Sequence, residues 1–263
     1  MDYFNVLKSA LFLRSAVFIV LYMTFTFIVS RIKGKISVID CFWGVGFVAL
    51  GLYLLFSQGH FCSRQLLLIT LVCLWGVRLS WHITARSSGK PDDRRYLVLT
   101  SLWQKYRSLQ IYLKVYLVQG IFMLLVALPI IITLSYCSGS LLFLDYCGLG
   151  LWIVGFFFEV VGDYQLDVFL KNPDNKGKIM RYGLWRYTRH PNYFGEVAMW
   201  WGIFLIALSG PHGLLAILSP LTISYLLLYV SGIPMLEKNF ENNPEFQEYK
   251  KKTSSFFPWF EKK

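Results

Sequence analysis

The sequence lacks the short motifs by which soluble proteins bind nucleotides or metals. Neither GxGxxG nor GxxxxGK[ST] occurs in its 263 residues, and this absence excludes a nucleotide fold of the soluble type. Its five cysteines form no CxxC pair and no spacing typical of metal ligands, so we expect no metal site. Most of them lie in or beside apolar runs, where we expect small core residues.

Acidic residues are also scarce: 15 Asp and Glu stand against 26 Lys and Arg, giving a formal net charge of +11. Such a charge could indicate nucleic-acid binding, but 56% of the residues are hydrophobic and the mean hydropathy is +0.49. These values indicate a polytopic membrane protein, in which basic loops set the topology. We therefore expect membrane lipids and no nucleic acid as partners, and a monomer.

Seven apolar runs approach the roughly 20 residues that a membrane-spanning helix needs. No small-residue cleavage pattern follows the first run, so we interpret it as a retained span. Without internal repeats or low-complexity linkers, residues 1–263 are predicted to form one integral membrane domain, an all-α bundle of seven helices. The predicted spans cover residues 10–30, 36–56, 66–84, 112–136, 142–169, 193–209 and 213–233.

Basic residues alternate between the predicted loops. The first, third and fifth loops and the C-terminal tail hold most of them, whereas the other three loops hold only Arg64. The positive-inside principle then places the N-terminus outside and the C-terminus in the cytoplasm. Cys62 and Cys137 could meet on one side of the membrane, which the sequence does not decide.

Polar residues within the spans gather in their cytoplasmic halves. Because ionisable groups are costly there, each is a functional candidate, and together they predict a polar cavity open to the cytoplasm. The alternative is structural pairing, of Asp40 with Arg78 and of the acids in the fifth span with arginines of the next loop. The set comprises Asp40, Arg78, His82, Tyr112, Tyr116, Gln119, Glu159, Asp163, Asp167, Glu196 and Glu237.

Residues 183–202, GLWRYTRHPNYFGEVAMWWG, form the most distinctive stretch. Pro191 predicts a helix start, whose unpaired N–H groups face a basic loop and suit a phosphate or pyrophosphate. The acidic residues of the fifth span suit a different part of such a ligand, one that offers hydroxyl or amide donors. The predicted ligand shell around this helix start comprises Arg189, His190, Asn192, Tyr193 and Glu196.

Segment 91–108, PDDRRYLVLTSLWQKYRS, mixes charged residues with Tyr96, Leu97, Leu99, Leu102, Trp103 and Tyr106. This mixture predicts a short amphipathic helix at the cytoplasmic interface. The segment serves either as an anchor in that interface, which we favour, or as a lid.

Three stretches resemble the steroid 5-alpha-reductase superfamily, in its bacterial branch: SVIDCFWGVGF (37–47), WGVRLSWHITARSSGKPDDRRY (75–96) and DYQLDVFLKNPDNKGKIMRYGLWRYTRHPNYFGE (163–196). The resemblance implies seven transmembrane helices in a bacterial inner membrane. It also implies NADPH bound in a cytoplasm-facing cavity, with residues 155–263 forming the cofactor-binding part. The implied activity is reduction of an alpha,beta-unsaturated carbonyl in a lipidic, steroid-like substrate.

Position by position, the resemblance implies cofactor contacts for Asp163, Asn192 and Glu196. Asp40 lies near the family's acidic residue, which polarises the substrate carbonyl. The family's tyrosine on the third span has no counterpart, since Trp75, Arg78 and His82 lie there instead. The catalytic candidates are Asp40 and His82. The cofactor-binding candidates are Asp163, Lys171, Lys176, Arg186, Arg189, His190, Asn192, Tyr193, Glu196 and Glu237.

The RHPNY core and the C-terminal EYKKKTSSFFPWF also resemble membrane isoprenylcysteine carboxyl methyltransferases and phospholipid methyltransferases. This second resemblance implies S-adenosylmethionine in the same pocket. The larger basic set in the loop over residues 170–192 favours NADPH, whose extra phosphate needs a cationic contact.

Overall fold

The computed structural model of the chain describes residues 10–59, 61–137 and 140–262. Every regular element within these ranges is helical. The chain divides into two compact units. The first consists of the described parts of Met1–Leu142 together with Ala207–Leu218, and the second of Phe143–Ile206 with Ser219–Lys263, of which residues to 262 are described.

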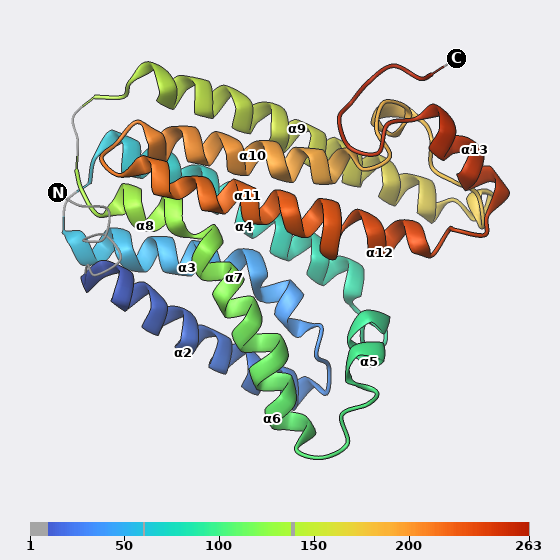
Figure 1. Cartoon of the computed structure of the whole chain (residues 1–263), viewed down its shortest axis with the longest axis horizontal. Coiled ribbons are helices and arrows are strands. Elements are labelled where there is room, and N and C mark those ends of the chain that lie inside the picture. The colour runs from blue at the N-terminus through green and yellow to red at the C-terminus, as the bar shows by residue number, and fades with distance from the viewer. Residues whose placement is uncertain (1–9, 60, 138–139, 263) are drawn as a thin grey trace. The chain divides into compact units, whose positions relative to one another are not determined.

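Three long helices dominate the first unit. α3 (Val38–Gln58) packs against α4 (Ser63–Ser87) and also against α2 (Ala10–Lys33), and Figure 1 shows this arrangement in blue and cyan. α3 and α4 approach closely because Gly44 and Gly76 face each other; a Cβ added at Gly44 would lie 2.3 Å from the Gly76 carbonyl oxygen. The unit also contains α5 (Arg94–Thr100), α6 (Arg107–Ile111), the π-helix η1 (Tyr112–Leu117), α7 (Val118–Val126), α8 (Leu128–Leu134) and the 3-10 helix η4 (Gly213–Ile217).

The second unit is built on α9 (Phe143–Lys171) and α10 (Pro191–Leu208), of which residues 191–206 belong to it. α9 and α10 meet at glycines: a Cβ at Gly155 would lie 2.5 Å from the Gly195 carbonyl oxygen, and one at Gly148 equally near that of Gly202. The remaining elements are η2 (Pro173–Asn175), η3 (Gly183–Arg186), α11 (Leu218–Tyr225), the π-helix η5 (Leu226–Val230), α12 (Ile233–Lys238) and α13 (Pro244–Lys252).

Six helices of the described residues are long and apolar enough to cross a membrane, consistent with an integral membrane protein, whereas the sequence predicted seven spans. The predicted span at 193–209 corresponds to α10, whose first two turns carry the polar Asn192 and Glu196, and it is not among the six. The six are Ala10–Lys33, Val38–Gln58, Ser63–Ser87, Arg107–Val126, Phe143–Lys171 and Gly213–Lys238.

The predicted span at 112–136 has different bounds in the structure. The candidate span runs over Arg107–Val126 and α8 begins separately at Leu128. Pro129 stands in the first turn of α8. Because proline has no N–H and its ring clashes with the preceding turn, the helix cannot continue unbroken through it.

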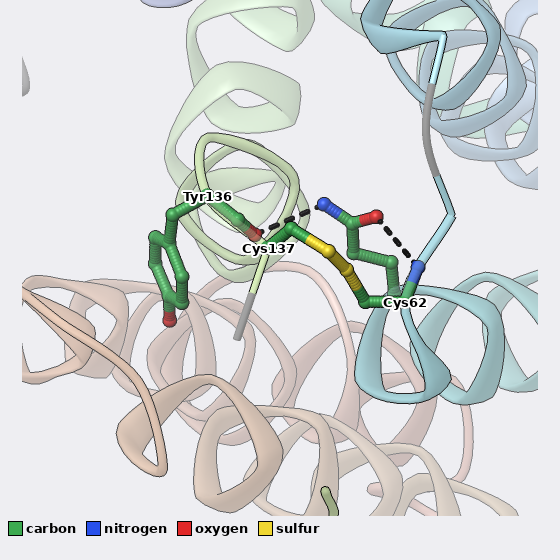
Figure 2. The surroundings of a disulfide bond; sticks show 4 residues. Cys62, Tyr136 and Cys137 are labelled. Atoms are coloured by element: carbon green, nitrogen blue, oxygen red, sulfur yellow. Dashed lines mark hydrogen bonds between the residues drawn. A yellow bond between two sulfur atoms is a disulfide. The ribbon is translucent and has the colours of Figure 1, made fainter. Parts of the chain in front are cut away.

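A disulfide joins Cys62 to Cys137 in the first unit, with their Cα atoms 5.7 Å apart (Figure 2). The amide of Gln65 ties the same two segments: its Oε1 accepts from the backbone N–H of Cys62 at 3.2 Å, and its Nε2 donates to the Tyr136 carbonyl at 3.0 Å. The start of α4 is therefore fixed to the segment that follows α8. The pairing that the sequence left undecided is present in the structure.

We expect Gly155→Ala to lower the apparent melting temperature of the detergent-solubilised protein. The added Cβ meets backbone, which cannot yield like a flexible side chain, and such overpacking costs about 1–3 kcal/mol. Gly150→Ala is the matched control on the same helix, since a Cβ there meets nothing within 4 Å. Equal melting temperatures for the two variants would contradict the close packing of α9 on α10.

Removal of the disulfide by Cys62→Ser should lower stability by roughly 2–4 kcal/mol, because the bridge restricts a long loop of the unfolded chain. The bridge closes a sequence separation of 75 residues. Cys73→Ser on α4, a free cysteine, is the control. Counting maleimide-reactive thiols in denaturant before and after reduction checks the bond itself: three and then five are expected, and five from the start would show the pair to be reduced.

Candidate functional site

The first unit holds a polar cluster around the carboxylate of Asp40, near the start of α3. The Tyr96 hydroxyl donates to Oδ1 of Asp40 at 2.6 Å, and Nη2 of Arg95 donates to Oδ2 at 3.0 Å. Nε2 of Gln119 donates to the Tyr96 hydroxyl oxygen at 3.0 Å. Tyr96 is 7% exposed, so the phenol is held between a carboxylate and an amide in a buried position.

Two neighbouring aspartates place Tyr96 in this cluster. The Asp92 carboxylate accepts from the backbone N–H groups of Ile36 and Ser37 at 2.8 and 2.9 Å, tying the segment before α5 to the start of α3. Asp93 caps α5 by accepting from the Arg95 backbone N–H at 2.8 Å, and such caps stabilise short helices. The first turn of α5 therefore lies beside Asp40.

The surroundings of Tyr96 keep its phenol protonated. Burial, followed by the negative charge of Asp40, raises the pKa of Tyr96 well above its usual value. A neutral phenol is a hydrogen-bond donor, and the amide of Gln119 donating to its oxygen favours partial negative charge there. The single phenol proton is donated to Asp40 in this structure, and rotation of the hydroxyl lets it be donated instead to another oxygen that gains negative charge.

The sequence did not indicate Tyr96 as a site residue, because this tyrosine falls in the segment that was predicted to be an amphipathic helix at the interface. The helix that contains Tyr96, α5, is only seven residues long. Most of α5 is exposed, including Leu97, Val98 and Leu99, and only Tyr96 and Thr100 are buried. The available signal was DDRRY itself, with two aspartates immediately before two arginines and an aromatic hydroxyl.

The remaining catalytic candidate, His82, lies half-buried on α4. The Asp40 contacts described above come from Arg95 and Tyr96 of α5. The alternative interpretation, in which Asp40 serves structural pairing, expected Arg78 of α4 as its partner. The catalytic roles of Asp40 and His82 stay predictions.

The second unit brings Asp163 and Asn192 together. Nδ2 of Asn192, at the start of α10, donates to Oδ1 of Asp163 on α9 at 3.0 Å, and Asp163 is 7% exposed. The contact follows from close packing, since a Cβ at Gly162 would lie 3.1 Å from the Pro191 ring. Nε1 of Trp185 also donates to the Gly162 carbonyl at 3.0 Å. The structure therefore brings together two residues that the sequence gave separately as cofactor-binding candidates.

Arg189, His190 and Glu237 form a second, buried polar group beside this helix start. Nε of Arg189 lies 2.9 Å and Nε2 of His190 3.1 Å from the same carboxylate oxygen, Oε1 of Glu237 on α12. Nη1 of Arg189 donates to the carbonyls of Lys250 and Thr253 at 3.2 and 2.5 Å. This guanidinium joins α12 and the C-terminal segment to α10, an arrangement that the sequence did not indicate.

The chain after α13 lies along the loop that precedes α10 (Figure 1). The Arg189 backbone N–H donates to the Ser254 carbonyl at 2.9 Å, and the Thr188 hydroxyl donates to the Phe256 carbonyl at 2.9 Å. One turn of α13 contributes as well, since the Tyr249 hydroxyl donates to the Trp185 carbonyl. The C-terminal segment thereby fixes the backbone conformation that leads into Pro191.

The other cofactor-binding candidates are more accessible. Lys171, Lys176 and Arg186 are exposed, whereas Tyr193 and Glu196 are half-buried on α10. Nε of Arg186 lies 3.3 Å from the Glu261 carboxylate. This pair borders a surface cavity of about 460 Å³ that Tyr187, Phe260 and Lys262 also line. The ligand contacts assigned to these side chains stay predictions.

Comparisons with known proteins find similarity over two different lengths of the chain. A human protein, "3-oxo-5-alpha-steroid 4-dehydrogenase 1", is 39% identical over 62 residues, which is 24% of this chain and 24% of the relative. The protein of the same name from Macaca fascicularis matches equally. The chain thus matches about a quarter of the length of these curated relatives, and no solved structure matches it significantly.

The longer match is to a protein family. The family described as "Protein of unknown function (DUF1295)" matches residues 26–253, which include both polar clusters. The chain belongs to this family, which is steroid 5-alpha-reductase-like.

Proposed function

We propose that the protein is a membrane-embedded reductase that transfers hydride from NADPH to an alpha,beta-unsaturated carbonyl of a lipidic, steroid-like substrate. The observation that carries the proposal is the buried phenol of Tyr96, held between Asp40 and Gln119. Reduction of an enone places negative charge on the carbonyl oxygen, and a preformed donor stabilises that charge. The family and the name of the human relative support the same chemistry.

The residues of the second unit suit the proposed cofactor. The Asp163 carboxylate and the Asn192 amide offer an acceptor and a donor at the start of α10, as a carboxamide or a ribose requires. The exposed Lys171, Lys176 and Arg186 suit its phosphates. NADPH, when bound, supplies the hydride.

The side chains around Asp40 would act on the substrate. Rotation of the Tyr96 hydroxyl turns its proton from the Asp40 carboxylate towards the substrate carbonyl, while Gln119 continues to donate to the phenol oxygen. As hydride adds to the beta carbon, the electron pair of the double bond moves to the carbonyl oxygen and forms an enolate, which this donor stabilises. A proton from solvent water then adds to the alpha carbon as the enolate re-forms the carbonyl, which completes the saturated product.

We also propose that the N-terminus lies outside and the C-terminus in the cytoplasm of a bacterial inner membrane. The disulfide supports this orientation. Cys62 and Cys137 lie in or beside two predicted loops with few basic residues, and disulfides persist on the oxidising side of such a membrane. The predicted monomeric state and the lack of nucleic-acid binding belong to the same proposal.

Asn192→Ala should abolish the thermal stabilisation that NADPH gives the purified protein, because the variant loses an amide at the cofactor's polar end. A ligand that binds only the folded state at 100 times its Kd stabilises by about 2.7 kcal/mol, which a melting curve resolves. Asn242→Ala, at an exposed position of the same unit, is the control and should retain the shift. Stabilisation of the unaltered protein by S-adenosylmethionine and not by NADPH would contradict the reductase and favour a methyltransferase.

Tyr96→Phe should lower kcat for reduction of a 3-oxo-4-ene steroid by roughly 10²–10⁴-fold, the usual contribution of a positioned acid. NADPH oxidation followed by absorbance measures the rate. Stabilisation by NADPH should persist in this variant, which separates loss of chemistry from loss of fold. Tyr106→Phe, at an exposed tyrosine after α5, is the matched control, and equal rates for the two variants would remove Tyr96 from the mechanism.

A further inference from the structure

His190 presents a buried nitrogen whose hydrogen-bonding capacity is unused. The residue is 5% exposed, and its Nε2 lies 3.1 Å from Oε1 of Glu237. Its other ring nitrogen, Nδ1, is buried without a hydrogen-bond partner among the residues that the structure describes. A buried polar atom left in this state costs about 1–3 kcal/mol, so the site is incomplete without a further group.

The contacts of Glu237 determine which nitrogen of the His190 ring carries the proton. A carboxylate only accepts hydrogen bonds, so its contact with Nε2 requires the proton there. The negative charge of Glu237 is already balanced, since Arg189 lies 2.9 Å from the same oxygen and the Lys250 ammonium 3.4 Å from the other. A charged imidazolium is therefore not needed, and burial lowers the pKa of His190 below its usual value. Nδ1 of the neutral ring carries a lone pair.

The ring cannot readily turn to satisfy Nδ1 elsewhere. It stacks on Tyr193 with an interplanar angle of 12° and a centroid separation of 5.6 Å, while Glu237 holds the opposite nitrogen. Its backbone N–H is also engaged, donating to the Thr188 hydroxyl at 3.3 Å. His190 stands two residues before Asn192, whose amide contacts Asp163.

We propose that Nδ1 of His190 is an acceptor for a hydrogen-bond donor of the bound ligand, a sugar hydroxyl or a carboxamide NH₂, and does not bind phosphate. This assignment changes the role that the sequence gave His190 within an anion-binding shell. It rests on the proposed function only for the identity of the ligand as NADPH. Glu237 is then a positioning residue that holds the proton on Nε2.

Two readouts on the full-length protein in lipid nanodiscs test this assignment. The first is the ¹⁵N spectrum of histidine-labelled protein, which contains four histidines, with the His190 signals identified by their loss in His190→Asn. The ligand-free protein should show an unprotonated Nδ1. A protonated Nδ1 would overturn the proposal whether or not NADPH is the ligand.

Addition of NADPH should move the Nδ1 resonance in the direction of an accepted hydrogen bond, whereas inorganic pyrophosphate should leave it in place. A shift with pyrophosphate contradicts the proposal. If NADPH does not bind at all, the proposed function fails separately, and S-adenosylmethionine, which also carries ribose hydroxyls, becomes the probe. An Nδ1 resonance unmoved by both ligands overturns the inference itself.

The second readout is the pH dependence of the NADPH dissociation constant. A protonated ring cannot accept a hydrogen bond, so the affinity for NADPH should fall at least tenfold in acid. Because the pKa of His190 is lowered, this fall should occur below about pH 6.5, the ordinary pKa of histidine. A phosphate contact would instead strengthen as the ring becomes charged. The charged groups around the ring are Glu237 of α12, Lys250 of α13 and the neighbouring Arg189, whose ordinary pKa values lie outside this range.

Variants distinguish the acceptor from a merely structural ring. His190→Phe keeps an aromatic ring against Tyr193 but removes the acceptor, and should weaken NADPH binding about 10–100-fold, with a shallower pH dependence. His190→Asn returns an oxygen near the Nδ1 position and should recover part of the affinity. Equal affinity in His190→Phe and the unaltered protein, or affinity that rises in acid, would exclude the proposed contact.

Discussion

The carboxylate of Glu237 is the point on which the second unit depends. Two segments supply cationic or N–H groups to it, the loop before α10 through Arg189 and His190, and α13 through Lys250. Buried charge is costly unless it is paired and hydrogen-bonded, so these segments must meet in one arrangement. The guanidinium of Arg189 extends the same constraint to the carbonyls of Lys250 and Thr253. The start of α10, and with it the position of Asn192, follows from this arrangement.

In the first unit, carboxylates near helix starts have a comparable effect. Asp92 binds the backbone before α3, Asp93 caps α5, and Asp40 receives Tyr96 and Arg95 from α5. A seven-residue helix has little stability of its own, and these contacts give it a defined place. Asp92 and Asp93, which the sequence did not single out, therefore help to position the phenol proposed to act in catalysis.

The basic residues before α10 fall into two groups, one buried and one exposed. Arg189 is buried and engaged by protein groups, whereas Lys171, Lys176 and Arg186 are exposed. Close approach of α9 and α10 at paired glycines brings Asp163 to Asn192. A carboxylate, an amide and an unused imidazole nitrogen thus occur near one helix start, a combination that suits a ligand rich in hydroxyl or amide groups.

The sequence alone determined the helical class, the positions of most long apolar helices and the helix start at Pro191, because these depend on local apolar length and proline geometry. Tertiary structure alone decided the Cys62–Cys137 bond, the contact of Asp163 with Asn192, the contact of Tyr96 with Asp40 and the attachment of the C-terminal segment to Arg189. Each of these joins residues far apart in the chain or depends on one helix packing on another. Such contacts leave no periodic trace in the sequence, since a tyrosine on a short amphipathic helix looks the same whether it faces lipid or a buried carboxylate.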